Sequence, residues 1–121
     1  MVTYVIAPND LSSAFIADLS SIVSKRGLAP TVGKAVDDTG KTLHVLDAEG
    51  SDIRLRSENV LLSGQEDPEK CGVHSEPYPD PGQYFISLSF WDEASGSERA
   101  EELLRSLTSD LEARGYQVRS D

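Results

Sequence analysis

Residues 84–91 read YFISLSFW, and this stretch decides the fold. Large apolar side chains recur at every second position, which is the period of a β-strand with one buried face. One face carries Tyr84, Ile86, Leu88 and Phe90, and the other carries Phe85, Ser87, Ser89 and Trp91. We therefore expect a strand over residues 84–91 whose first face meets the core.

An amphipathic helix is expected after this strand. It begins after residues 95–97, because Ser95 and Glu98 have the spacing of a capping box. Its apolar residues step by three or four positions and form one stripe: Ala100, Leu103, Leu104, Leu107 and Leu111. Arg114 and Gly115 suit the end of a helix, and residues 116–118 suit a final edge strand.

The N-terminal part predicts a strand followed by a helix as well. Residues 2–7 are rich in β-branched and aromatic types, which favours a strand. The helix is expected after Pro8, with Asn9 or Asp10 as its N-cap, and Gly27 is expected to end it. Its apolar stripe consists of Leu11, Phe15, Leu19, Ile22 and Val23.

Three further strands are expected between these parts, over residues 31–36, 41–47 and 52–56. Residues 37–40 and 48–51 suit hairpin loops, and residues 59–63 extend the third strand or form another. A chain of 121 residues is expected to form a single domain, residues 1–121. The order of elements predicts an α+β two-layer sandwich, a mostly antiparallel sheet with two helices on one face, ferredoxin-like with an extra hairpin.

Residues 64–83 form a long acidic loop. Four prolines exclude a regular helix or a continuous ladder: Pro68, Pro77, Pro79 and Pro81. Loops longer than about 12–15 residues are often functional. Cys71 and His74 lie close enough in sequence to share a metal ion, but a structural zinc site needs four protein ligands, so we expect no metal and no cofactor.

Charge is unevenly distributed along the chain. The sequence has 21 acidic and 11 basic residues, and residues 63–102 hold ten of the acids and two of the bases. This balance argues against nucleic acids and anionic membranes as partners. It favours a cationic protein, because opposite charges speed encounter. It is equally compatible with a charge that only keeps a small domain soluble.

Three features predict a cytoplasmic protein without membrane association. No apolar run approaches the roughly 20 residues of a membrane-spanning helix. The first residues lack the charged and apolar regions of a signal peptide. The single cysteine cannot form an internal disulfide, which suits a reducing compartment.

Catalytic motifs are missing from the sequence, and we expect no enzymatic activity. His44 and His74 are its two imidazoles, and no serine lies in a Gly-x-Ser-x-Gly sequence. Arg54 and Arg56 are expected beside Phe85 and Trp91, types that are enriched at binding hot spots. The face that carries them either binds a partner or is covered by the long loop.

A small acidic α+β domain without signal peptide or catalytic motif resembles the immunity proteins of bacterial toxin-delivery systems, contact-dependent or type VI. The resemblance implies an inhibitor that binds a cationic toxin, often a nuclease whose basic cleft attracts carboxylates. The aromatic residues would anchor the contact. The candidate partner-binding residues are Glu66, Asp67, Glu69, Glu76, Tyr78, Asp80, Trp91, Asp92, Glu93, Glu98, Glu101 and Glu102.

Two other functions are compatible with the sequence. The first is a small-ligand-binding or regulatory ferredoxin-like domain, which could be dimeric through a sheet edge. The second is a small enzyme that uses His44 or His74 as a general base. The sequence leaves the oligomeric state open.

Overall fold

The computed structural model describes residues 3–36, 38, 40, 42–62, 64, 65, 67, 69, 78–91 and 97–120. The elements follow one another along the chain in the order β1 (Thr3–Ile6), α1 (Phe15–Lys25), β2 (Ala29–Val36), β3 (Thr42–Glu49), β4 (Arg54–Leu61), β5 (Tyr84–Phe90), α2 (Glu98–Ala113) and β6 (Gln117–Ser120). The strands expected over residues 52–56 and 59–63 are therefore one strand, β4.

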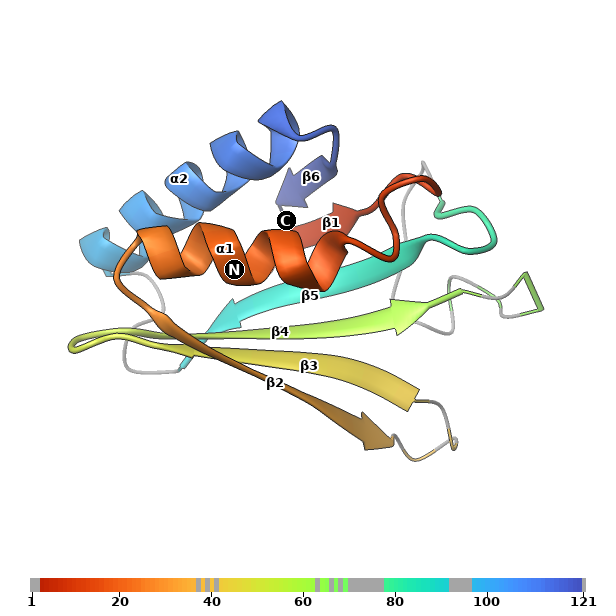
Figure 1. The fold of residues 1–121 in the computed structure, drawn as a ribbon, viewed down its shortest axis with the longest axis horizontal. Coiled ribbons are helices and arrows are strands. Elements are labelled where there is room, and N and C mark those ends of the chain that lie inside the picture. The colour runs from red at the N-terminus through yellow and green to blue at the C-terminus, as the bar shows by residue number, and fades with distance from the viewer. Residues whose placement is uncertain are drawn as a thin grey trace.

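The strands of the described chain form one six-stranded sheet with the order β2-β3-β4-β5-β1-β6. Every neighbouring pair is antiparallel. Both helices lie on the same face of this sheet (Figure 1). These observations confirm the predicted α+β two-layer sandwich, with the hairpin of β2 and β3 at one side. The ferredoxin-like assignment stays a prediction.

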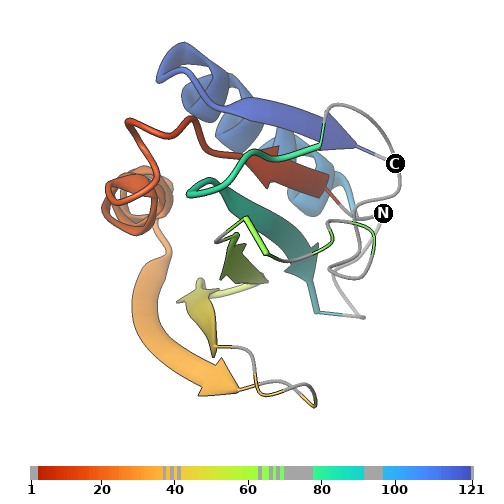
Figure 2. The same cartoon turned by 90° about the vertical axis from the view of Figure 1, so that its right-hand side faces the viewer.

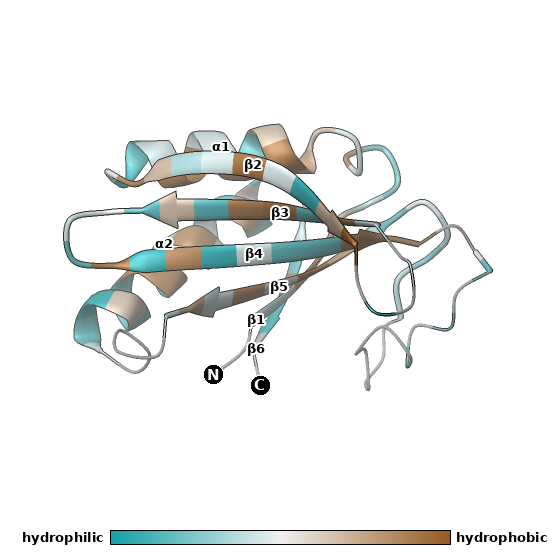
Figure 3. Cartoon of the chain, turned by 90° about the horizontal axis from the view of Figure 1, so that it is seen from below, coloured by the Kyte–Doolittle hydropathy of each residue, from teal (hydrophilic) through white to brown (hydrophobic). Residues whose placement is uncertain are grey.

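The hydrophobic core lies between the two helices and the sheet. Tyr84, Ile86 and Leu88 of β5 belong to it, and Phe90 packs against it, which confirms the predicted buried face. The apolar stripes of both helices supply most of the other core residues. Figure 3 views the opposite face of the sheet, which we call the open face, and shows a polar middle in β4 with apolar residues nearer its ends.

The start of α1 differs from the prediction. The helix begins at Phe15, and its N-cap residue is Ala14, so the expected cap at Asn9 or Asp10 is wrong. The preceding residues form successive turns in which the Leu11 N–H donates to the Pro8 carbonyl at 2.9 Å. The Ser12 hydroxyl donates to the same carbonyl at 3.0 Å. These short-range bonds hold the segment in turns before the α-helix starts.

α2 begins after residues 95–97 as predicted and both helix ends agree with the sequence, whereas the capping residue of α2 differs. Ser97 is the N-cap of α2, and its hydroxyl accepts a hydrogen bond from the Ala100 N–H at 3.1 Å. The expected capping box of Ser95 and Glu98 is therefore wrong. Gly27 and Gly115 have φ angles of 83° and 98°, a conformation that favours glycine directly after a helix.

In the described part of the chain, neither helix has the length and apolar character needed to cross a membrane.

Candidate functional site

The candidate residues fall into two groups in the structure. Asp67, Glu69, Tyr78 and Asp80 lie in the connection between β4 and β5, and we call them the loop group. Glu98, Glu101 and Glu102 lie in the first turns of α2, and we call them the helix group. Glu66, Glu76, Asp92 and Glu93 lie outside the described residues, as do Cys71 and His74.

The two groups lie at opposite ends of β5. The loop group precedes Tyr84, where β5 begins, and the helix group follows Phe90, where it ends (Figure 1). A strand of this length separates them by about 20 Å. The candidate residues therefore do not form one continuous surface, because β5 carries the chain across the sheet between the two groups.

Backbone hydrogen bonds hold the part of the loop group that adjoins β4 and β5. The Leu62 N–H donates to the Gln83 carbonyl at 3.0 Å, and the Gly82 N–H donates to the Leu62 carbonyl. Gln83 also joins Asp80, because its side-chain oxygen accepts from the Asp80 N–H at 2.5 Å. These bonds continue the pairing of β4 and β5 past the ends of both strands. Asp80 is thereby held next to the point where β4 ends and β5 begins.

Further out, the side chains of the loop group contact one another. The Tyr78 hydroxyl donates to Oε1 of Glu69 at 3.3 Å. Oδ1 of Asp67 accepts from the Glu69 N–H at 3.0 Å. All four side chains are exposed, with Tyr78 39% exposed. The loop group therefore presents carboxylates around an accessible aromatic ring.

The helix group lies on one exposed face of α2. Positions i, i+3 and i+4 of a helix are neighbours, so Glu98, Glu101 and Glu102 form a cluster of like charges. The positive end of the helix dipole stabilises acids in the first turn. Arg99, the base among them, pairs with Asp52 of the β3–β4 connection at 3.4 Å. The acids of the helix group thus stabilise α2 itself.

The described ion pairs use acids outside both groups. Asp18, Asp47, Asp52, Glu58 and Asp110 are the acids that lie within 4.0 Å of an arginine. Among the described residues, no carboxylate of the loop group or helix group pairs with a base.

Trp91 lies apart from both groups, on the open face. It lines a hollow of about 270 Å³ together with Asp47, Arg54, Arg56, Ser89 and Phe90. Arg56 is held there by Glu58 at 2.8 Å and by Asp47 at 3.6 Å. Trp91 is 44% exposed, in agreement with an accessible aromatic at this position. Trp91 thus lies beside the two arginines as predicted, whereas the expected place of Phe85 beside them is wrong, because Phe85 lies opposite Val60 near the other end of β5.

Phe85 behaves differently from Trp91, although both belong to the same face of β5. Its side chain is only 6% exposed. Its ring stacks on the ring of Tyr4 from β1, with centroids 5.2 Å apart and an interplanar angle of 19°. The open face is thus apolar and covered at the start of β5, and charged and accessible at its end.

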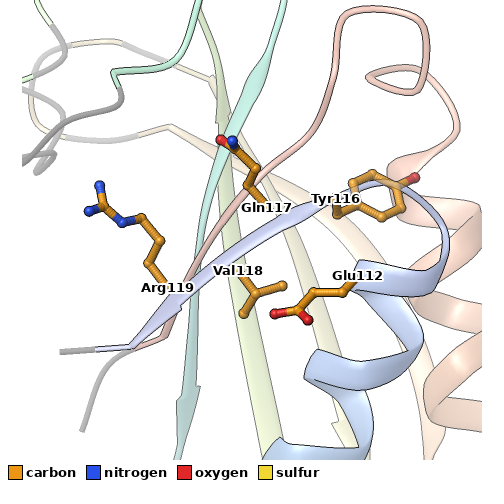
Figure 4. A pocket seen from close by; sticks show the side chains of 5 residues that line it. All are labelled: Glu112, Tyr116, Gln117, Val118 and Arg119. Carbon is orange, nitrogen blue, oxygen red and sulfur yellow. The ribbon is translucent and has the colours of Figure 1, made fainter.

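A second hollow, of about 310 Å³, lies along β6 (Figure 4). It is lined by Glu112, Tyr116, Gln117, Val118 and Arg119. In Figure 4 the Tyr116 hydroxyl points away from the other labelled side chains. That hydroxyl donates to Asp18 at 2.5 Å, so it contributes to packing and not to the hollow.

The histidine within the described residues, His44, contacts an aromatic ring. Its imidazole meets the edge of Tyr84 at 5.6 Å between centroids, and it lies opposite Asn59 in the sheet. Within the described ranges, no group of three histidine, cysteine or acidic side chains converges to hold a metal ion.

Asn59 was not singled out by the sequence. It is fully buried, its oxygen accepts from the Ser57 hydroxyl at 3.0 Å, and its Nδ2 has no partner within the described structure. A polar residue at a buried strand position has no signal in the sequence until the face of the strand is known.

Neither the protein-family models nor the curated proteins contain a match to this chain.

Proposed function

We propose that this protein is a non-catalytic inhibitor of the immunity type that binds a cationic partner enzyme through the loop group. The observation that carries this proposal is the separation of its acids into two kinds. Five described acids of the sheet, its connections and the helices pair with arginines, whereas the exposed acids of the loop group have no base beside them among the described residues. Unpaired charges of one sign attract a partner of the opposite sign.

The loop group is favoured over the helix group as the docking surface. Acids in the first turn of α2 stabilise that helix through its dipole, so their presence is explained by the fold. The carboxylates of Asp67 and Asp80 have no such helix to stabilise. Tyr78 adds an accessible ring of the type that is enriched in binding hot spots.

The distance between the two groups determines whether their charges act together on a partner. At physiological salt the Debye length is about 8 Å, so charges about 20 Å apart act almost independently. The loop group therefore contributes contacts and affinity, and the helix group contributes little to a contact made at the loop group. A nuclease with a basic cleft has the complementary charge, and carboxylates would occupy the phosphate sites of such a cleft.

The test compares two variants with the same change of charge. One carries Asp67→Asn, Glu69→Gln and Asp80→Asn, and the other carries Glu98→Gln, Glu101→Gln and Glu102→Gln. Tagged wild type and both variants are used to capture proteins from the source organism, and captured proteins are identified by mass spectrometry. We expect a cationic enzyme bound by the wild type and the helix-group variant, and lost from the loop-group variant.

Kinetics provide the second measurement. The association rate constant of the captured enzyme is expected to fall steeply with added sodium chloride, because steered association depends on ionic strength. Equal capture by both variants, or an association rate that is indifferent to salt, would contradict the proposal.

A further inference from the structure

Strand β2 forms one edge of the sheet (Figure 1). It pairs with β3 at every position from Ala29 to Val36, so its backbone is regular along the whole strand. Val32 and Val36 are 51% and 69% exposed. A long, regular edge strand with exposed apolar side chains is a template for pairing with another strand.

The opposite edge of the sheet is different. Strand β6 has four residues, half the length of β2, and it carries Arg119. Short edges with charged side chains are protected against pairing with other chains. On β2, only Lys34 and Pro30 provide protection of this kind. Strand addition is therefore expected at β2.

The residues around the β2 edge carry little negative charge. β2 contains no acid, and Lys34 is its one charged residue. The exposed residues of α1, which lies along the same side of the molecule in Figure 2, are Ala17, Ser21, Ser24 and Lys25. In a chain of net charge −10, this is the side on which two copies approach with least repulsion.

We propose that a second copy of this chain pairs with β2 in antiparallel orientation, across a two-fold axis at Gly33. A two-fold axis makes the contact self-complementary, because each strand offers the other the same residues. In this register Val32 faces Lys34 of the second copy, and Pro30 faces Val36. Like charges do not face each other directly, and the apolar residues meet apolar residues or the aliphatic stem of a lysine.

The ends of the paired strands are complementary in charge. In the same register Asp38, in the turn after β2, is level with Leu28 of the second copy. Leu28 lies three residues after Lys25, the last residue of α1, and Arg26 beside it already pairs with Asp110 at 2.6 Å. The acidic turn of each copy therefore approaches Lys25 of the other. This places attraction at both ends of a centre whose charged residues are the two copies of Lys34.

The area buried in this contact can be compared with the area that stable dimers bury. Eight residues span about 26 Å, and a sheet edge about 10 Å deep then buries roughly 500 Å² in total. Stable interfaces bury about 1,200 Å² or more. The contact is therefore smaller than a stable interface, and the dimer is expected to be weak and to form only at high protein concentration.

Two substitutions at one exposed position test the register. In Val32→Lys, like charges face each other at both symmetry-related positions, and the dimer is expected to weaken about tenfold. In Val32→Glu, a carboxylate faces Lys34 at both positions. That dimer is expected to be at least as tight as the wild type, although the variant adds negative charge. Sedimentation equilibrium up to about 1 mM measures all three proteins, and circular dichroism checks that they are folded.

Each outcome of this experiment either supports or overturns the proposed pairing. A weak wild-type dimer that is lost in Val32→Lys and kept in Val32→Glu supports the pairing. A monomeric wild type at the highest concentration overturns it, and so does a dimer that Val32→Lys leaves unchanged. A dimer that is weakened by Val32→Glu alone overturns it as well. Both variants leave the loop group intact, so the result is independent of the proposed inhibitor function.

Discussion

The hydroxyl of Tyr116 shows how single residues join distant parts of this fold. It donates to Oδ2 of Asp18 at 2.5 Å, and the Arg114 guanidinium donates to Oδ1 of the same carboxylate at 2.8 Å. Asp18 thereby links α1 to the residues that follow α2. Burial raises the pKa of Tyr116 well above its ordinary value of 10.0, and the hydrogen bond to Asp18 and the charge of Asp18 raise it further.

This contact predicts an effect of pH on the variant Tyr116→Phe. Near neutral pH the variant is expected to lose about 1–2 kcal/mol of the free energy of unfolding, because a charge-assisted hydrogen bond is removed. The folded state holds the Tyr116 proton more tightly than the unfolded chain does. The wild type therefore loses stability as the pH rises above 10.0, by up to about 1.4 kcal/mol per unit.

Urea unfolding followed by circular dichroism, at pH values from about 8 to about 11, measures the difference between the two proteins. The difference should shrink to near zero at the alkaline end. The other tyrosines titrate in both proteins and cancel in the comparison. A difference that stays constant over this range would show that the Tyr116 proton is not coupled to folding.

The buried amide of Asn59 predicts a stabilising substitution. An unpaired buried donor costs about 1–3 kcal/mol, and a polar pair replaced by apolar groups of similar shape is often neutral or stabilising. The variant Ser57→Ala/Asn59→Leu removes both the unpaired Nδ2 and the hydroxyl that bonds to the Asn59 oxygen. We expect the free energy of unfolding to rise by about 1 kcal/mol in a urea titration.

The single variant Asn59→Leu is the comparison for this pair. It leaves the Ser57 hydroxyl buried without its acceptor, so it should be less stable than the double variant. A double variant that is less stable than the wild type would mean that the amide has an acceptor in solution.

Phe85 and Trp91 show what a sequence can predict about single residues. The alternation of β5 assigns both to the open face, and the structure confirms this for Trp91, which is accessible. The burial of Phe85 depends on Tyr4, which reaches it only through the pairing of β1 with β5. Strand periodicity carries no information on which strands become neighbours.

At the scale of elements, the first turn of α2 depends on Ser97. Its hydroxyl accepts from the Ala100 N–H, one of the amides that the helix itself leaves unpaired. Ser97→Ala is expected to lower the free energy of unfolding by about 1 kcal/mol, and Ser97→Asp to retain it. Thermal unfolding followed by circular dichroism measures both.

Ser109→Ala is the matched control, because Ser109 is an exposed serine within the same helix. There the substitution should be neutral or slightly stabilising, since alanine has the higher helix propensity. An equal loss in Ser97→Ala and Ser109→Ala would show that the cap does not contribute.

The elements and the start of α2 were predictable, whereas the start of α1 and the capping residues of both helices were not. The apolar stripes of both helices and the glycines that end them are visible in the sequence, because both depend on local geometry. The cap of α1 was misassigned because the residues after Pro8 form turns and the helix starts behind Ala14, which has no polar side chain. The cap of α2 was misassigned because two serines near its start suit the role. At α2, Ser95 and Ser97 are both serines, and the structure uses the one closer to Ala100.

At the scale of the whole molecule, the net charge of −10 predicts a response to salt. Self-repulsion destabilises a compact chain, and salt screens it. Raising sodium chloride from about 20 mM to about 300 mM is expected to raise the Tm by roughly 4 °C, or about 1 kcal/mol. Differential scanning calorimetry measures the shift, and potassium chloride serves as a control for ion-specific effects. A lower Tm at high salt would mean that the arginine ion pairs outweigh the repulsion.

The candidate site was only partly predictable at this scale. Residues 63–102 are the acidic stretch of the sequence, and the acids within it that the structure describes are exposed, as expected. Their division into a loop group and a helix group could not be read from composition. It arises because β5 lies inside the acidic stretch and carries the chain across the sheet.

Trp91 is the single tryptophan of the chain and lies outside the core. Its indole emission is therefore an optical reporter of the open face at the end of β5. Unfolding changes its surroundings less than it would change those of a core tryptophan, because the ring already contacts solvent. A blue shift of this emission when a candidate ligand is added would indicate that the ligand covers the surface around Arg54 and Arg56.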